Sequence, residues 1–110
     1  MTTRRREVQN PVDARMRDHF IQPTTILNTT PIEKSMLGAP LPCSVYLHSL
    51  SSTGRKIEVS LNDGTTYEEV TYALDGLNAD GVTYQKRVTF YTGVSDIRIT
   101  GDANDTFGAR

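Results

Sequence analysis

"RKIEVSLNDG", residues 55–64, decides the fold class of this 110-residue chain. Apolar and polar residues alternate through its first part, with Ile57, Val59 and Leu61 on one side and Lys56, Glu58 and Ser60 on the other. This alternation is typical of a strand with one buried face, because successive side chains of a strand point to opposite sides. "NDG" at 62–64 then predicts a turn, since Gly64 can adopt the left-handed backbone conformation that hairpin turns need.

Four more segments after residue 42 have the composition of strands and are separated by turn-forming residues. They are "CSVYLHSL" (43–50), "TTYEEVTYAL" (65–74), "VTYQKRVTFY" (82–91) and "VSDIRIT" (94–100). We expect "DGLNADG" (75–81) to be a loop and "GDANDTFGAR" (101–110) to be a short polar tail with Phe107 as its anchor. Five short strands without a convincing helix predict a small antiparallel β-sandwich or barrel over residues 43–110.

Prolines and glycines divide the chain near residue 42. All 5 prolines lie at or before Pro42, and all 8 glycines lie at or after Gly38. Because proline fixes φ and lacks a backbone donor, prolines at regular intervals disfavour long helices and central strands. The sequence therefore predicts an extended N-terminal arm over residues 1–42, with at most one short helix, at about 11–21.

The predicted arm contains more apolar residues than a disordered tail would. We expect these side chains to be buried, either against the chain's own β-domain or against a neighbouring subunit. The candidate subunit contacts are Phe20, Ile26, Leu27, Ile32, Met36 and Leu37.

The arm also carries the one basic cluster of the chain, Arg4, Arg5 and Arg6. Such a cluster is a candidate electrostatic contact with phosphate or with an acidic protein surface. The alternative is a solvated terminus that contributes only to solubility.

Composition limits the classes of function. The chain has 12 basic and 13 acidic residues and a net charge of −1, which argues against a protein that coats nucleic acid. Its single cysteine, Cys43, cannot form an internal disulfide or assemble a zinc site. No apolar run reaches the ~18 residues that cross a membrane, and no signal peptide is evident. We therefore expect a soluble protein that is made in a cytoplasm and stays there unless it leaves within a larger particle.

No pattern in the sequence indicates catalysis. A nucleophilic triad needs a base next to its nucleophile, but His48 and Ser49 are adjacent on a predicted strand and so face apart. Glu68 and Glu69 are a poor carboxylate pair for the same reason. We predict that the chain is not an enzyme and binds no cofactor.

The loop "DGLNADG" resembles a calcium loop only superficially. A helix–loop–helix calcium site needs an acidic residue where Gly76 stands and a glutamate near the position of Arg87. Turn chemistry alone explains Asp75, Asn78 and Asp80, and we predict no metal site.

The chain's last predicted strand, within "YTGVSDIRITG" (91–101), and its arm-plus-β-domain organisation resemble the small virion structural proteins of tailed bacteriophages. This resemblance implies a non-catalytic head decoration, fibre-base or connector component of the virion, made in the host cytoplasm. Its partners would be other copies of itself or a capsid, portal or tail protein. The alternative is a monomeric glycan-binding β-module that uses exposed tyrosines, drawn from Tyr46, Tyr67, Tyr72, Tyr84 and Tyr91.

Overall fold

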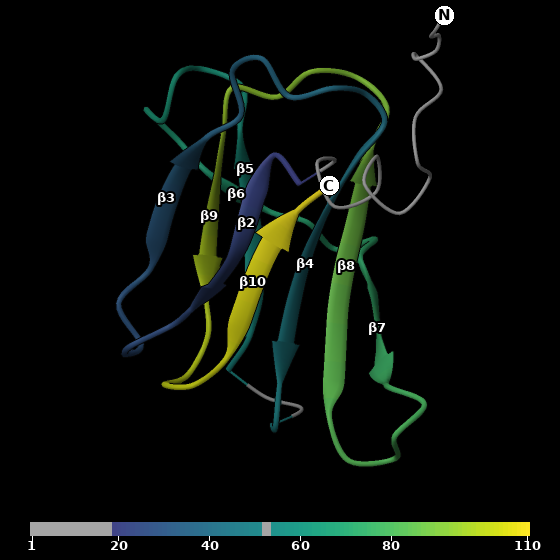
Figure 1. The fold of residues 1–110 in the computed structure, drawn as a ribbon. Helices are drawn as coiled ribbons and strands as arrows, with labels where there is room; N and C mark the ends of the chain where they lie inside the picture. The colour runs from purple at the N-terminus through teal and green to yellow at the C-terminus, as the bar shows by residue number, and fades with distance from the viewer. Residues whose placement is uncertain (1–18, 52–53) are drawn as a thin grey trace, which may run out of the picture.

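The computed structural model describes residues 19–51 and 54–110, and this part of the chain forms two antiparallel sheets and no helix. The five-stranded sheet has the order β2-β10-β4-β8-β7 and the four-stranded sheet the order β3-β9-β5-β6 (Figure 1). The strands are β2 (Ile21–Thr25), β3 (Ile32–Ser35), β4 (Cys43–Ser49), β5 (Lys56–Ser60), β6 (Glu68–Glu69), β7 (Leu74–Leu77), β8 (Tyr84–Phe90), β9 (Asp96–Thr100) and β10 (Thr106–Ala109). The predicted all-β antiparallel fold is confirmed, as a sandwich of two sheets.

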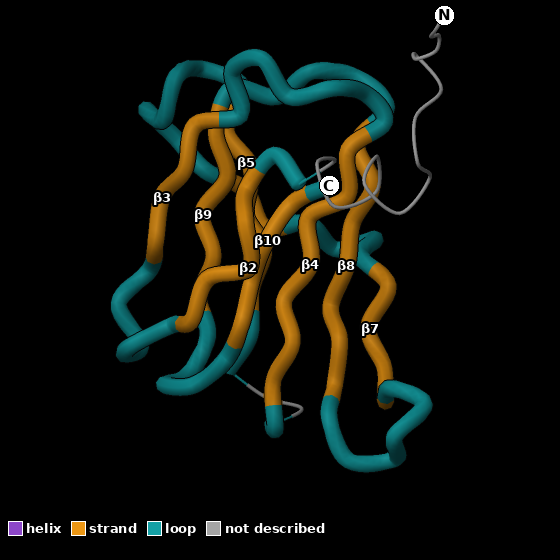
Figure 2. Tube along the Cα trace, in the orientation of Figure 1, coloured by secondary structure: helices purple, strands orange, loops and turns teal. Residues whose placement is uncertain are grey.

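The strands pair in a nested order. β5 pairs with β6, β4 with β8, β3 with β9 and β2 with β10, always antiparallel. The chain therefore follows the path of one long hairpin with its tip at residues 61–67. This hairpin is rolled up, so that successive strand pairs along it belong alternately to the two sheets (Figure 2). This is the topology of a jelly roll, and β7 extends it by pairing with the outer side of β8.

The predicted boundary at residues 42 and 43 does not separate an arm from a domain. β2 and β3 precede this boundary, yet each is an edge strand of a sheet. Pro23 fits in β2 because an edge strand leaves some backbone donors unpaired, and because the register of β2 against β10 shifts at this point. The remaining prolines of the described chain lie in the loops before β3 and β4. The predicted helix falls mainly on residues 1–18, which lie outside the described residues.

The predicted polar tail is also wrong, because it contains β10, which lies between β2 and β4. Phe107 is fully buried, and Ala109 is buried beside it. The tail escaped prediction because β10 offers only two apolar residues in phase, separated by Gly108. β10 closes the sandwich by hydrogen-bonding to the beginning of the described chain, with Phe20 N donating to Ala109 O at 2.8 Å.

The region between β5 and β8 differs from its prediction in a similar way. The predicted strand at 65–74 is reduced to β6, and β7 begins where a loop was expected. Leu61, predicted to face the core, is exposed because β5 ends at Ser60 and the chain turns away.

The core lies between the sheets and is built from the inward-facing residues of both. It contains Ile26, Met36, Cys43, Val45, Leu47, Ile57, Val70, Val88, Phe90, Ile97, Ile99, Phe107 and Ala109. Burial of these side chains is the main favourable term for folding, at roughly 1.5–3 kcal/mol for each large one.

Candidate functional site

The predicted subunit contacts separate into two groups. Ile26 and Met36 are 1% and 5% exposed and belong to the chain's own core. Their sequence neighbours Leu27 and Leu37 are 81% and 87% exposed. The remaining two, Phe20 and Ile32, are partly buried against the core. The structure therefore corrects the prediction for Ile26 and Met36, because side chains inside the sandwich cannot at the same time contact a neighbour.

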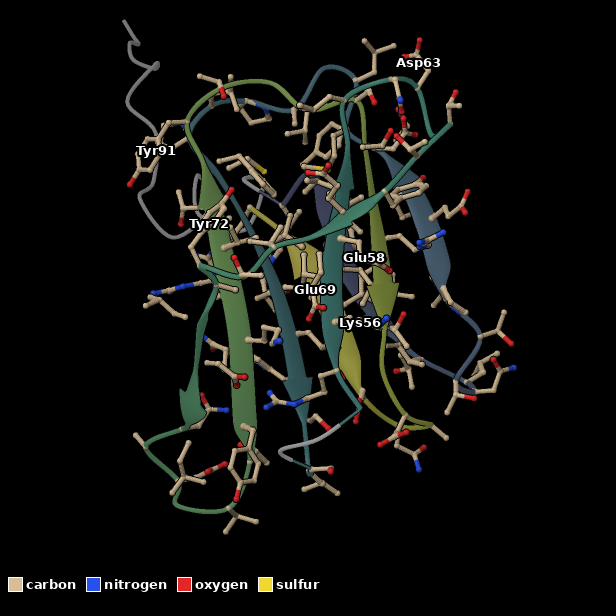
Figure 3. The ribbon with its side chains drawn as sticks, turned by 180° about the vertical axis from the view of Figure 1, so that it is seen from behind. Lys56, Glu58, Asp63, Glu69, Tyr72 and Tyr91 are labelled. Atoms are coloured by element: carbon tan, nitrogen blue, oxygen red, sulfur yellow. The ribbon has the colours of Figure 1, made fainter. Side chains whose placement is uncertain are left out.

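Exposed large apolar side chains lie at both ends of the sandwich: one group lies at or beside the loops 26–31, 50–55 and 78–83, namely Leu27, Leu50, Leu77 and Val82, and a second group lies at the opposite, upper end. This upper end, at the top of Figure 1, consists of the loops 36–42, 61–67 and 91–95. Its exposed large apolar residues are Leu37, Leu41, Leu61 and Tyr91. Figure 3 shows Tyr91 and Asp63 on these loops, at opposite sides of the upper end. The predicted electrostatic contact, Arg4, Arg5 and Arg6, lies outside the described residues.

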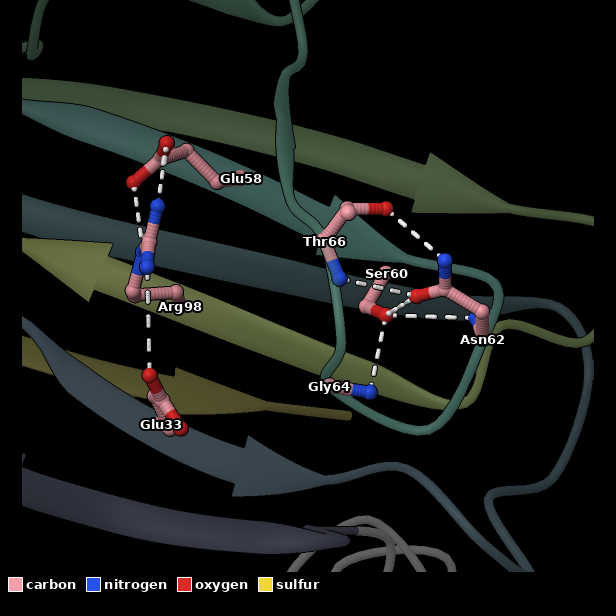
Figure 4. A network of polar contacts seen from close by, with 7 residues as sticks. All are labelled: Glu33, Glu58, Ser60, Asn62, Gly64, Thr66 and Arg98. Atoms are coloured by element: carbon pink, nitrogen blue, oxygen red, sulfur yellow. Dashed lines mark hydrogen bonds and ion pairs between the residues drawn. The ribbon is translucent and has the colours of Figure 1, made fainter.

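An ion-pair ladder crosses the outer face of the four-stranded sheet. Arg98 donates from Nε and Nη2 to the two carboxylate oxygens of Glu58, both at 3.0 Å, and its Nη1 lies 3.8 Å from Glu33 Oε2 (Figure 4). The Arg98 guanidinium also stacks over the Tyr67 ring at 4.3 Å. The hydrogen bonds from Arg98 hold the pKa of Glu58 below its usual value. These contacts connect the three strands β3, β5 and β9. We therefore interpret Arg98 as a structural residue and not as part of a binding site.

The turn predicted at 62–64 is confirmed, and its polar residues serve the turn itself. Ser60 Oγ accepts hydrogen bonds from the amides of Asn62 and Gly64, at 3.2 and 2.9 Å. Asn62 Oδ1 accepts from Thr66 N at 3.0 Å, which extends the network across the loop (Figure 4). Gly64 has a φ of 82°, the left-handed value that favours glycine.

The polar residues of the loop 75–81, which was considered for calcium, make contacts within the protein. Asp80 accepts hydrogen bonds from the amides of Val82 and Thr83, both at 2.9 Å, and from Thr83 Oγ1 at 2.6 Å. The bonds from Thr83 and Val82 lower the pKa of Asp80 to about 2. Asp75 instead pairs with Arg55 at 2.8 Å. In the described part of the chain, no three His, Cys, Asp or Glu side chains are placed to hold a metal ion together.

The outer face of the five-stranded sheet contains a hollow of about 570 Å³. It is lined by Pro23, Ser44, Tyr46, His48, Gln85, Arg87, Thr106 and Arg110. Alternate residues of β4 and β8 point outward into it, and the residues between them point into the core. The register places Tyr46 opposite Arg87 and His48 opposite Gln85. None of the described side chains that line the hollow is acidic, and two of them, Arg87 and Arg110, are cationic.

Tyr46 forms the floor of this hollow. A β-carbon at Gly108 would lie 2.7 Å from Tyr46 Cζ, so the tyrosine ring lies across β10 in the space that the glycine leaves. The His48 ring is tilted beside it, with the ring centroids 5.1 Å apart, and His19 Nε2 lies 3.4 Å from Tyr46 Oη. Burial raises the pKa of Tyr46, and the charge of Arg110 opposes this shift. The hydroxyl of Tyr46 can donate a hydrogen bond, as any tyrosine hydroxyl can at neutral pH.

Two pairs of polar side chains on this face of the sheet are hydrogen-bonded to each other. His48 Nε2 and Gln85 Oε1 are 2.8 Å apart, as are Ser44 Oγ and Thr89 Oγ1. His48 thus bonds an amide, whereas a catalytic base is usually oriented by a carboxylate. Cys43 points into the core, and burial raises the pKa of its thiol, which disfavours the reactive thiolate. The prediction that the chain is not an enzyme stays a prediction.

Sequence reasoning named Tyr46 among five tyrosines but missed Arg87 and Arg110. The available signal for Arg87 was the outward-facing set of two strands, which contains this one arginine and no acidic residue: Ser44, Tyr46 and His48 on β4 and Gln85, Arg87 and Thr89 on β8. Arg110 follows the strand that was not predicted, β10, and had no such signal. The other tyrosines lie elsewhere: Tyr72 and Tyr91 are exposed (Figure 3), Tyr67 stacks on Arg98, and the Tyr84 ring lies 5.6 Å from the Arg55 guanidinium.

No helix in residues 19–51 and 54–110 has the length and apolar character to span a membrane. Comparison of the chain with protein-family models, with curated proteins and with solved structures finds no match in any of the three.

Proposed function

We propose that this chain is a non-catalytic structural subunit that assembles with neighbouring proteins through the upper end of its sandwich. The observation that carries the proposal is that the loops 36–42, 61–67 and 91–95 expose four large apolar residues, Leu37, Leu41, Leu61 and Tyr91. Single exposed apolar residues are normal on a protein surface, whereas contiguous ones are typical of an interaction surface, and the proposed assembly brings these four residues into one contact.

The kind of assembly that we propose is a virion, with the chain as a head decoration, fibre-base or connector component. Its support is the resemblance to tailed-phage structural proteins together with the jelly-roll topology, which viral capsid domains use. The same topology serves lectins and cupins, so this part of the proposal rests on analogy of fold. The partners would be further copies of the chain or a capsid, portal or tail protein. Mass spectrometry of purified particles tests the placement, since a virion component is expected in many copies in each particle.

Sedimentation equilibrium tests the apolar contact. Leu37→Ser/Leu61→Ser removes two leucines from the upper end, and each leucine that becomes buried in an assembly contributes roughly 1.5–3 kcal/mol. The double variant should therefore weaken self-association by about 100-fold or more. Leu74→Ser is the control, because Leu74 is also an exposed leucine but lies on β7, away from the upper end. A wild-type chain that stays monomeric would rule out self-assembly.

A second candidate function, ligand binding, is favoured by the hollow on the five-stranded sheet.

A further inference from the structure

We infer that the hollow on the outer face of the five-stranded sheet is a binding site for an acidic saccharide, that is, a sugar bearing a carboxylate. The inference is independent of the proposed assembly, because the hollow lies on a sheet face and the assembly contact lies on loops of the upper end. Three features of the hollow carry it: its charge, its aromatic floor and its remaining hydrogen-bonding groups.

The charge comes from two arginines on either side of Tyr46. Arg87 is its cross-strand neighbour on β8, and Arg110 follows β10 and is bonded through its backbone to Ser44. Among residues 19–51 and 54–110, neither guanidinium has a carboxylate or hydrogen-bond partner. A guanidinium can bind a carboxylate through two parallel hydrogen bonds. Each of these two arginines could therefore bind the carboxylate of a ligand in this way.

No carboxylate of the sheet competes for these arginines. The acidic residue of the neighbouring strand β7 is Asp75, which is directed to Arg55 at 2.8 Å and Lys86 at 3.8 Å. Both of these partners are largely buried, whereas Arg87 is exposed at the surface of the hollow. The two guanidiniums are therefore not neutralised by a side-chain carboxylate of the described sheet.

The floor and the walls suit a sugar ring. The end of the Tyr46 ring packs over Gly108, with the His48 ring beside it, and the tyrosine ring offers an apolar surface to the carbon-bound hydrogens of a pyranose. The hydroxyls of Ser44 and Thr89 form one bond with each other and keep further donor and acceptor capacity. The Gln85 amide group likewise retains its two N–H donors, since its oxygen faces His48. A volume of about 570 Å³ lies in the usual range for small-ligand sites.

The same features disfavour nucleic acid as the occupant. Proteins that bind duplexes typically neutralise several phosphates, of the order of 6–10 in strong cases, and the hollow supplies two guanidiniums. The opposite sheet face carries the exposed carboxylates of Glu33 and Glu69, which would repel a polyanion. A small anionic ligand fits this distribution of charge better than a long one.

Calorimetric and NMR titration of the full chain tests the inference. The probes are oligosaccharides of galacturonate, glucuronate and N-acetylneuraminate, each beside its methyl ester, which keeps the ring and removes the charge. We expect at least one acid to bind and its ester to bind about tenfold more weakly or worse, with amide shifts confined to β4, β8 and β10.

Variants separate the features of the site. Arg87→Gln and Arg110→Gln should each weaken the acid about tenfold and leave the ester unchanged. Lys56→Gln is the matched control, because it removes one exposed positive charge from the four-stranded sheet and should change nothing. Tyr46→Leu keeps apolar bulk but removes the ring, and should weaken acid and ester by the same factor.

Four results would overturn the inference, and the first three come from the sugar titrations. They are the absence of binding by every acidic probe up to about 10 mM, a range in which even weak millimolar sites are detected; equal binding of acid and ester; and equal loss of binding in Lys56→Gln and Arg87→Gln. Displacement of the sugar by inorganic phosphate at equal concentration would show an anion site without selectivity for saccharides, which also contradicts the inference.

Discussion

Replacement of two neighbouring residues, Ile26 and Leu27, tests whether the segment before residue 43 belongs to the sandwich. Ile26→Ala removes a side chain that is 1% exposed, and Leu27→Ala removes one that is 81% exposed. A β-carbon at Gly101 would lie 2.9 Å from Ile26 Cδ1, so the end of this side chain packs tightly against backbone. Backbone collapses poorly into a cavity, which places the expected loss for Ile26→Ala in the upper part of the 2–5 kcal/mol range for such changes, at about 4 kcal/mol.

The assay is urea unfolding of both variants, followed by far-UV circular dichroism. Leu27→Ala should change the free energy of unfolding by less than about 0.5 kcal/mol, because it removes no buried contact. Since a domain of this size is stable by about 5–15 kcal/mol, the difference between the variants should move the midpoint strongly. Equal midpoints would refute the account, because an extended arm has no reason to treat these two residues differently.

Three further predictions concern the closing strand, the hollow and the ion-pair ladder. Phe107→Ala should cost about 3–5 kcal/mol in urea unfolding, where a polar tail would predict almost no loss. Gly108→Ala should lower the free energy of unfolding by about 1–3 kcal/mol, because the new methyl group collides with the Tyr46 ring. Gly76→Ala is the control, since its β-carbon would have open space around it and should not cause this loss. Equal effects of the two changes would contradict the packing of Tyr46 over Gly108. Arg98 depresses the folded pKa of Glu58 below 4.5, so the carboxylate stabilises the fold above pH 4.5 and this contribution disappears as the pH falls through the folded pKa. Glu58→Gln should therefore be less stable than wild type near neutral pH and should lose less stability below pH 4.5, and parallel pH profiles of unfolding would contradict the ladder.

The strands with the strongest alternation were predictable from sequence. The strands predicted at 43–50, 55–61, 82–91 and 94–100 correspond to β4, β5, β8 and β9 within a few residues, because each directs alternate apolar side chains toward the core. The outer strands were not predictable by the same rule. β2 contains Pro23, and β10 contains Gly108, and both residues normally argue against a strand. Their strand character comes from pairing with each other across 80 or so residues of chain, as Thr25 with Thr106, which no local pattern contains.

The candidate sites show the same division. The sequence identified the segment 26–37 as one with apolar residues that need a partner. Ile26 is buried in the core and its neighbour Leu27 is exposed. This difference is seen only in the packed structure. The hollow depends on the register of three strands, which brings Tyr46, Arg87 and Gly108 into one row. Sequence supplies these residue types, whereas their proximity follows from the rolled topology.

Amide hydrogen exchange of the intact chain tests the central claim most directly, namely that the first and last described strands close a jelly roll. Phe20 N donates to Ala109 O at 2.8 Å and Ile26 N donates to Asp105 O at 2.7 Å. If β2 and β10 close the sandwich, these two amides should be protected to a degree close to that of the β4 amides, because both sets open only when the sandwich does. Exchange of Phe20 and Ile26 at the rate of an unfolded peptide, with β4 still protected, would show an arm detached from its domain and would contradict the account.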